Sequence, residues 1–281
     1  MDAWLIDLPK RKFFVMGDTH LHYPNDKNDH TLRKYVKYCL ENQIHFIDAG
    51  DTLDFSTRTS KTNPNETHIS NHELKKYLVD IYKPLAQAGL LDGIIEGNHT
   101  MRAWDSCGLL PIEDVVDRLN SFAPPSNHVR YLKSRAVIVY KIPVKGEKNQ
   151  QGFFKIYVGH GAGGGATDGG AVNALKKNLS VVRNADLYIE GHRGKCSVTY
   201  NEILDIELPR GSQGTKVYLN PSEIKFIQLP GLHFTKDSYA EQKGYPPSNH
   251  THFVIELCIA RKNNDRIRRN SKKILITELN F

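Results

Sequence analysis

Residues 13–20, Phe13-Phe-Val-Met-Gly-Asp-Thr-His20, join a short apolar run to a polar motif, and this arrangement recurs along the chain. It returns at residues 46–54, Phe-Ile-Asp-Ala-Gly-Asp-Thr-Leu-Asp, and at residues 93–99, Gly-Ile-Ile-Glu-Gly-Asn-His. Apolar residues at helical spacing occupy residues 30–42 and 70–88, between these units. This alternation of strand, polar loop and helix predicts a layered α/β fold. Because ligands bind at the carboxyl ends of strands in such sheets, we expect the polar motifs to form the functional site.

The chain beyond residue 130 is dominated by predicted strands. Apolar, β-branched and aromatic residues gather at 136–144, 153–158, 186–190, 198–208, 225–229, 252–260 and 274–277. No change of composition marks a linker, so we predict a single domain over residues 1–281, in which two mixed β-sheets pack together and are flanked by helices. The motif-bearing core covers about residues 13–195, and residues 196–281 complete the sandwich. The polar segment 57–70 is expected to be a surface insertion.

Composition excludes several classes of protein. Hydrophobic residues make up 39% of the 281, which is ordinary for a folded domain and excludes a disordered chain. No run approaches the ~18 apolar residues of a membrane span, and the first residues lack the basic opening and apolar core of a signal peptide. We therefore expect an intracellular, cytoplasmic protein with no membrane partner. The four cysteines form no Cys-x-x-Cys pair, which predicts reduced thiols.

A basic segment lies near the end of the chain. The net charge is +7, and seven of the thirteen residues 261–273 are lysine or arginine. The run separates two predicted strands, so we expect a hairpin with a basic tip. Such runs are more often solvated faces than contacts to nucleic acid, and both interpretations stay open.

Metal-ligating side chains cluster at the predicted strand ends: Asp18, His20, Asp51, Asp54, Asn98, His99, His160 and His192. Alternate residues of an extended segment point the same way, so Asp18 and His20 are expected to bind one ion together. The two carboxylate oxygens of Asp51 can bridge two ions. Mixed oxygen and imidazole ligands suit manganese, iron or zinc better than calcium or magnesium. One histidine at a strand end is usually structural, but eight such residues in five motifs indicate a metal centre.

The ordered motifs Gly17-Asp-Thr-His20, Gly50-Asp-Thr-Leu-Asp54, Gly97-Asn-His99, Gly159-His-Gly161 and Gly191-His192 resemble those of the calcineurin-like metallophosphoesterases. The resemblance implies a four-layer αββα sandwich with two divalent metal ions at the rim of the sheets. Position by position, it assigns the first metal to Asp18, His20 and Asp51, and the second to Asp51, Asn98, His160 and His192. It makes His99 the acid-base residue beside the phosphate, oriented by Asp54. A weaker similarity to bacteriophage-encoded members rests on the glycine-rich segment 159–170 and on residues 238–247.

The fifth motif departs from the family pattern. The family usually has Gly-His-x-His, but this chain has Gly191-His192-Arg193-Gly194, so the first metal loses a ligand. A water or phosphate oxygen is the favoured replacement, and the histidine alternatives are His22, His233, His250 and His252. Arg193 and Lys195 are predicted to bind the substrate phosphate, the alternative being that they are surface cations. The glycines of residues 159–170 are either an anion-binding nest or a rim loop.

The residues of the second and third motifs favour a phosphodiesterase over a Ser/Thr protein phosphatase. The arginines typical of Ser/Thr protein phosphatases are absent from Asp54-Phe55-Ser56 and from Glu96-Gly97-Asn98. We therefore predict a hydrolase, a metal-dependent phosphodiesterase or nuclease acting on nucleic acid or a nucleotide through a hydroxide that bridges two metals. Manganese is favoured, with iron and zinc as alternatives. The alternative functions are a small-molecule or nucleotide phosphomonoesterase and a catalytically weakened metal-binding scaffold.

Overall fold

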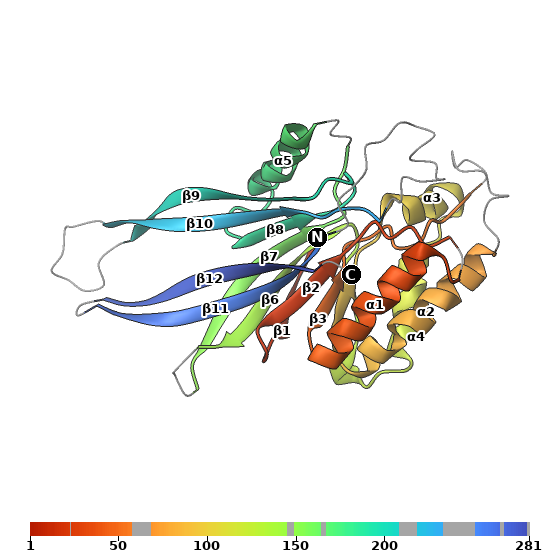
Figure 1. Cartoon of the computed structure of the whole chain (residues 1–281), viewed down its shortest axis with the longest axis horizontal. Coiled ribbons are helices and arrows are strands. Elements are labelled where there is room, and N and C mark those ends of the chain that lie inside the picture. The colour runs from red at the N-terminus through yellow and green to blue at the C-terminus, as the bar shows by residue number, and fades with distance from the viewer. Residues whose placement is uncertain are drawn as a thin grey trace.

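Two six-stranded sheets face each other in the computed structural model, with helices on the outer faces (Figure 1). The structure describes residues 1–22, 24–57, 69–144, 149–163, 167–207, 218–232, 251–264 and 267–279. One sheet, called the first sheet, has the order β1 (Asp2–Asp7), β6 (Arg135–Pro143), β7 (Gln151–Gly159), β8 (Leu187–Glu190), β10 (Tyr218–Gln228), β9 (Ser197–Glu207). The second sheet has the order β12 (Ile267–Leu279), β11 (His252–Asn264), β2 (Lys12–Met16), β3 (His45–Asp48), β4 (Leu91–Ile94), β5 (Arg130–Tyr131). Both sheets mix parallel and antiparallel pairs, so the predicted αββα sandwich is confirmed.

The helices cover the sheets unequally. The second sheet is covered by α1 (Lys27–Asn42), α2 (Asn71–Gln87) and α4 (Pro111–Asn120), while α5 (Asp168–Lys176) packs on the first sheet (Figure 1). The short α3 (Asn98–Cys107) leads from β4 to α4. Two 3₁₀ turns, Pro125–Asn127 and Lys177–Ser180, complete the described helical segments.

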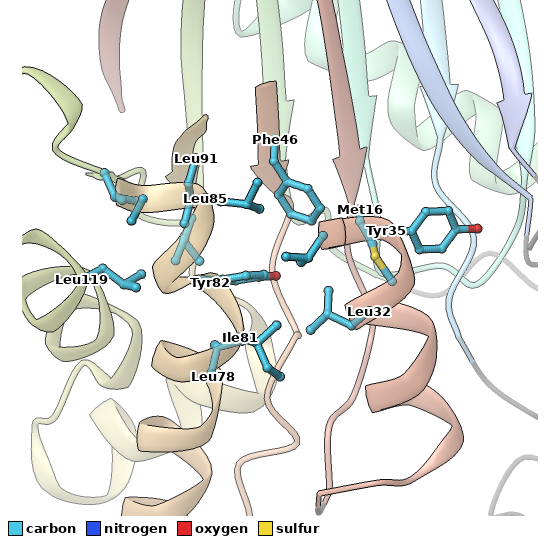
Figure 2. Packing of buried hydrophobic residues seen from close by; sticks show 14 of the residues in the cluster. Met16, Leu32, Tyr35, Phe46, Leu78, Ile81, Tyr82, Leu85, Leu91 and Leu119 are labelled. Atoms are coloured by element: carbon cyan, nitrogen blue, oxygen red, sulfur yellow. The ribbon is translucent and has the colours of Figure 1, made fainter. Parts of the chain in front are cut away.

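From Phe13 to Met16, strand β2 is apolar throughout because each of its two faces is buried in a different core. Its residues alternate between the two faces of the sheet, and both faces are covered. Phe13 and Val15 lie in the core between the sheets, whereas Phe14 and Met16 lie in the core beneath the helices. Figure 2 shows the second of these cores, where Met16 and Phe46 of the sheet meet side chains of α1 and α2. All four residues are essentially inaccessible to solvent, so the strand is fixed firmly and its carboxyl end is placed accurately.

The two predicted helices begin at capping residues. Asp26 accepts a hydrogen bond from the Asp29 amide at the start of α1, and Ser70 and Glu73 form a reciprocal capping box at the start of α2. The predicted elements did not include β1, α3 or α4, although Ile112, Val115, Val116 and Leu119 of α4 follow helical spacing and are buried. Residues 58–68, most of the expected surface insertion, lie outside the described residues.

The C-terminal strands are longer than predicted and form the expected antiparallel hairpin, β11 with β12. Phe253 pairs with Val15 and Glu256 pairs with Lys12, so β11 runs past the amino end of β2 and away from its carboxyl end. The hairpin and its neighbour, β9 with β10, extend together beyond the helices (Figure 1).

All four cysteines are free thiols. Within the described part of the chain, no helix combines the length and hydropathy needed to cross a membrane.

Candidate metal centre

Five strand ends meet at one edge of the sandwich. The second sheet contributes the loops after β2 and β3 and the start of α3 after β4, and the first sheet contributes the loops after β7 and β8. The side chains brought together there are those predicted from the motifs: Asp18, His20, Asp51, Asp54, Asn98, His99, His160 and His192.

One cluster joins the two sheets. Asp18, Asp51, His160 and His192 each present a ligand atom, and these atoms all lie within 4.8 Å of one another. Nε2 of His160 is 3.0 Å from Asp51 Oδ2 and 2.9 Å from Asn98 Oδ1, while its Nδ1 is 3.1 Å from the carbonyl oxygen of Ala49. With Nδ1 donating to that carbonyl, Nε2 faces two oxygen acceptors. A cation among these atoms would satisfy the nitrogen and the oxygens together, so the donor set fits a metal ion.

A second cluster lies beside the first and consists of His20, Asp54 and His99. Nδ1 of His99 contacts Asp54 Oδ1, and its Nε2 is 4.0 Å from Asp51 Oδ2. Nε2 of His20 is 3.9 Å from Asp18 Oδ1, so the two clusters share one centre. Asp54 therefore lies where the resemblance placed it, against the imidazole of His99.

Two motif glycines leave the space that the carboxylates occupy. A Cβ at Gly97 would lie 1.9 Å from Asp51 Oδ1, and a Cβ at Gly191 would lie 2.5 Å from Asp18 Oδ2. Backbone amides fix the same oxygens, since His99 N–H donates to Asp51 Oδ1 at 2.8 Å and His192 N–H donates to Asp18 Oδ2. Each glycine thus lets a neighbouring loop approach a carboxylate closely enough to bond it.

Four of these residues adopt left-handed backbone conformations. The φ angles are 52° at Asp18, 50° at His20, 52° at Asp51 and 70° at His192. Such angles cost on the order of 1–3 kcal/mol each in non-glycine residues and persist only where surrounding structure imposes them. The premise that Asp18 and His20 share a face because they are extended is therefore wrong. Their side chains approach each other through left-handed backbone at both positions, with Nε2 of His20 3.9 Å from Asp18 Oδ1.

Burial and mutual charge shift the proton affinities of the cluster. Burial raises the pKa of Asp18 to about 7, against the opposing charge of His160. Burial would also raise the pKa of Asp51, but the hydrogen bond and charge of His160 hold it well below its usual range. For His160, burial lowers the pKa, but Asp51 outweighs this effect and raises it to about 9. Burial and the charge of His160 lower the pKa of His192 to about 4. The cluster therefore needs positive charge among its oxygens, which protons or metal ions can supply.

The two predicted phosphate-binding cations have different surroundings. The guanidinium of Arg193 is turned inward and donates to Glu190 Oε2, Gln228 Oε1 and the Ala162 carbonyl, each at 2.9 Å. Lys195 is more exposed and its Nζ lies 3.3 Å from Asp168 Oδ1. A phosphate contact by Arg193 would require those internal hydrogen bonds to be broken.

Of the four histidines proposed as replacement ligands for the first metal, the structure describes two, and these differ in their positions. Nδ1 of His22 lies 3.2 Å from Asp54 Oδ2, so His22 borders the second cluster. The ring of His252 packs against Phe14 and Tyr35, in the aromatic part of the core beneath the helices. His233 and His250 lie outside the described residues, as do residues 238–247 and the middle of the glycine-rich segment, 164–166.

Sequence reasoning missed a buried residue that supports the loop of Asp51. Asp48, the last residue of β3, accepts hydrogen bonds from the Gly50 amide, the Thr52 hydroxyl and the Tyr82 hydroxyl. Burial raises its pKa to about 6. The available signal was an acidic residue inside an otherwise apolar run, where a charge needs partners.

Comparisons with known proteins give little further information. No family model matches the sequence, and no curated protein matches it. Among solved structures, the chain is similar to a conserved uncharacterised protein of Streptococcus pneumoniae TIGR4, described as a predicted phosphoesterase. The identity is 10%, the match covers 95% of this chain and 99% of the other, and the TM-score is 0.34.

Proposed function

We propose that this chain is a calcineurin-like metallophosphoesterase that hydrolyses phosphodiesters with two divalent metal ions. The observation that carries the proposal is the meeting of ligand residues from both sheets in two adjoining clusters, with Asp18 and Asp51 between them. Buried carboxylates of this density are costly unless a cation accompanies them. The order of the motifs along the chain supports the family assignment.

The donor atoms fit two sites. Asp18, His20 and Asp51 would hold the first ion. Asp51, Asn98, His160 and His192 would hold the second, so Asp51 belongs to both ligand sets. Two divalent ions supply Lewis-acid polarisation of phosphoryl oxygens and make a nucleophilic oxygen available at neutral pH. Against two carboxylate charges they also leave the centre positive, which favours an anionic phosphate.

We assign to His99 the transfer of a proton to the leaving group. Its Nδ1 is held by Asp54, which fixes the tautomer that carries a proton on Nδ1 when the ring is neutral. Its Nε2 points toward Asp51 at the centre, and the side chain is 19% exposed, so a substrate can reach it. When Nε2 is also protonated the ring is charged, and the Asp54 carboxylate would stabilise that charge; transfer of the Nε2 proton to the oxygen that leaves would return the ring to its neutral form. This role does not require His99 to bind metal.

We further propose a nucleic-acid substrate, and the distance from the centre to the basic hairpin distinguishes a polymer from a nucleotide. The basic run 261–273 lies in the β11–β12 hairpin, whose side chains from 260 to 271 lie outside the described residues. From Phe253, beside the carboxyl half of β2, to Asn264 the strand extends about 37 Å away from the centre, at ~3.4 Å per residue. A nucleotide in the centre cannot reach that tip, whereas a polymer can span both. A contribution of the tip to hydrolysis therefore identifies a polymeric substrate.

The test compares an aryl phosphodiester with its monoester, in excess chelator and after adding back manganese. We expect no hydrolysis in chelator, restoration by manganese, and a preference for the diester. Hydrolysis of the monoester alone would favour the phosphomonoesterase alternative. Manganese binding without hydrolysis of either ester would favour the scaffold. Full turnover in chelator, with no metal detected by elemental analysis, would overturn the two-metal proposal.

The nucleic-acid part is tested by replacing Arg266, Arg268 and Arg269 together with glutamine. If these side chains contact duplex phosphates, the slope of log binding constant against log salt falls by ~0.9 for each lost contact. Hydrolysis of the small aryl diester serves as the control and should not change. An unchanged salt slope would identify the tip as a solvated surface.

A further inference from the structure

The inward-facing Arg193 lies directly after the proposed ligand His192. Its side chain is 4% exposed, and that of Glu190, its ionic partner at 2.9 Å, is 5% exposed. The same guanidinium donates to Gln228 Oε1 and to the Ala162 carbonyl oxygen. Its remaining Nε is also buried and has no acceptor among the described residues. Arg193 is thus part of the protein interior, although its motif lies at the edge of the centre.

The three acceptors belong to three separate segments. Glu190 and Gln228 are the last residues of the neighbouring parallel strands β8 and β10. Ala162 lies in the loop that follows His160. One planar guanidinium therefore joins the loop of His160, the loop of His192 and the end of the first sheet. Arginine suits this position because its fork presents several donors in fixed directions.

The partners of Arg193 are themselves fixed. Gln228 Nε2 donates to the carbonyl oxygens of Glu190 at 2.9 Å and Gly191 at 2.6 Å, which holds the backbone just before His192. The other carboxylate oxygen of Glu190 accepts from Asn178 Nδ2 at 2.8 Å. A Cβ at Gly161 would lie 3.1 Å from the Gly191 carbonyl oxygen, so the two ligand loops already touch. The hydrogen bonds of Arg193 to Glu190 and Ala162 stabilise that contact.

We propose that Arg193 is a positioning residue for the metal centre, which holds His160 and His192 at the spacing that one ion requires. This inference rests on the proposed metal centre, because it concerns the two histidine ligands supplied by the first sheet. It replaces the expectation that Arg193 binds the substrate phosphate. Loss of the guanidinium releases both loops, so the metal affinity falls while the contacts of a bound substrate stay the same.

The experiment measures manganese affinity by calorimetry and, separately, KM for an aryl phosphodiester at saturating manganese. The variants are Arg193→Gln and Arg193→Lys. Residues that orient metal ligands typically contribute 10- to 100-fold in metal affinity. We expect Arg193→Gln to weaken manganese binding by ~10- to 100-fold with KM unchanged. We expect Arg193→Lys to restore little, because its donors all lie on one nitrogen, whereas the guanidinium reaches its acceptors through two. Arg183→Gln, which replaces an exposed arginine ten residues earlier, should leave both quantities unchanged.

A second pair of variants separates positioning from stability. Arg193→Gln leaves the buried Glu190 charge without its partner, which lowers the melting temperature for a reason unrelated to metal. The double variant Arg193→Gln/Glu190→Gln removes both charges, so the melting temperature of the chelated protein should recover while the manganese affinity stays low. Recovery of both quantities together would show that Arg193 acts only on stability and would overturn the proposal.

Three further outcomes are decisive. A raised KM with unchanged manganese affinity in Arg193→Gln would mean that Arg193 binds substrate, and the positioning role would be wrong. If the unaltered protein binds no manganese, the proposed metal centre itself fails, and the inference fails with it. Normal manganese binding by the unaltered protein and by every Arg193 variant would overturn the inference and leave the proposed function intact.

Discussion

Replacing Gly97 with alanine tests whether the metal centre depends on the space that this glycine leaves for the carboxylate of Asp51. A Cβ at position 97 would lie 1.9 Å from Asp51 Oδ1 and 2.3 Å from the Asp51 backbone nitrogen, and such contacts are essentially never shorter than 3.0 Å. The oxygen would have to move by at least the difference, about 1.1 Å, and the backbone nitrogen would have to move as well. The hydrogen bond from the His99 amide to that oxygen would be lost or lengthened.

The expected loss follows from this displacement. Misplacing a catalytic group by 1 Å costs ~10²-fold in rate, and overpacking costs ~1–3 kcal/mol of unfolding free energy. We therefore expect Gly97→Ala to lower the melting temperature, to lower the rate at saturating manganese by ~10²-fold, and to raise the manganese concentration needed for half-maximal rate. The assay is hydrolysis of an aryl phosphodiester across a manganese titration, with thermal unfolding measured in parallel.

Gly108 offers a matched control at the other end of the same helix. It caps the carboxyl end of α3 with φ at 70°, and a Cβ there would have nothing within 4 Å. Gly108→Ala should cost ~1 kcal/mol of stability through its backbone angle and leave the rate and metal dependence unchanged. If Gly97→Ala behaves like Gly108→Ala, losing stability alone, then Asp51 does not depend on the space at Gly97 and our account of the motif glycines is wrong.

Three further predictions concern the centre. His99→Ala should lower the rate by ~10²- to 10⁴-fold while retaining metal, whereas Asp51→Asn should lose metal. Elemental analysis together with kinetics distinguishes the two effects. Loss of metal from His99→Ala would contradict the role assigned to His99. In metal-free protein, the carboxyl of Asp18 has its pKa raised from 3.8 to about 7, so its stabilising contribution is complete below pH 3.8 and is lost as the pH rises through 7. Asp18→Asn should therefore melt higher than the unaltered chain at pH 8 in chelator but not at pH 3.5, and equal melting at pH 8 would refute the burial argument. Gly194→His should lower the manganese concentration needed for activity, at a cost of ~1 kcal/mol because φ at this position is 60°; a lower melting temperature with no change in manganese dependence would show that the position does not face the first metal.

The sequence identified the location of the centre because the signal is local. Each motif follows an apolar run within a few residues, as Gly17-Asp18 follows the run from Phe13 to Met16, and parallel strands bring their carboxyl ends to one edge. The helices at 30–42 and 70–88 were predictable for a similar reason, since helical spacing and a capping residue such as Ser70 occur in one short segment.

The geometry within the centre could not be predicted, because it depends on contacts between distant segments. The space that Gly97 leaves is filled by Asp51, 46 residues earlier, and one of the three acceptors of the inward-facing Arg193 is Gln228, 35 residues later. The left-handed angle at Asp18 results from bonds to Gly50 and Leu232, since the Asp18 amide donates to the Gly50 carbonyl and the Asp18 carbonyl accepts from the Leu232 amide. These contacts between distant residues cannot be inferred from the residue pattern of a single segment.

The division of the proposed ligands between the sheets has a consequence for the lifetime of the protein. Ions held by Asp51 from one sheet and by His160 and His192 from the other would tie the two layers together at the edge where they meet. Binding only to the folded chain adds RT ln(1 + [metal]/Kd) to its stability, ~2.7 kcal/mol when free metal is 100 times Kd. Because cellular proteases act on transiently opened chains, metal supply would control the abundance of this protein as well as its rate. Metal shortage would then remove the molecule by degradation, and restored activity would have to wait for new synthesis.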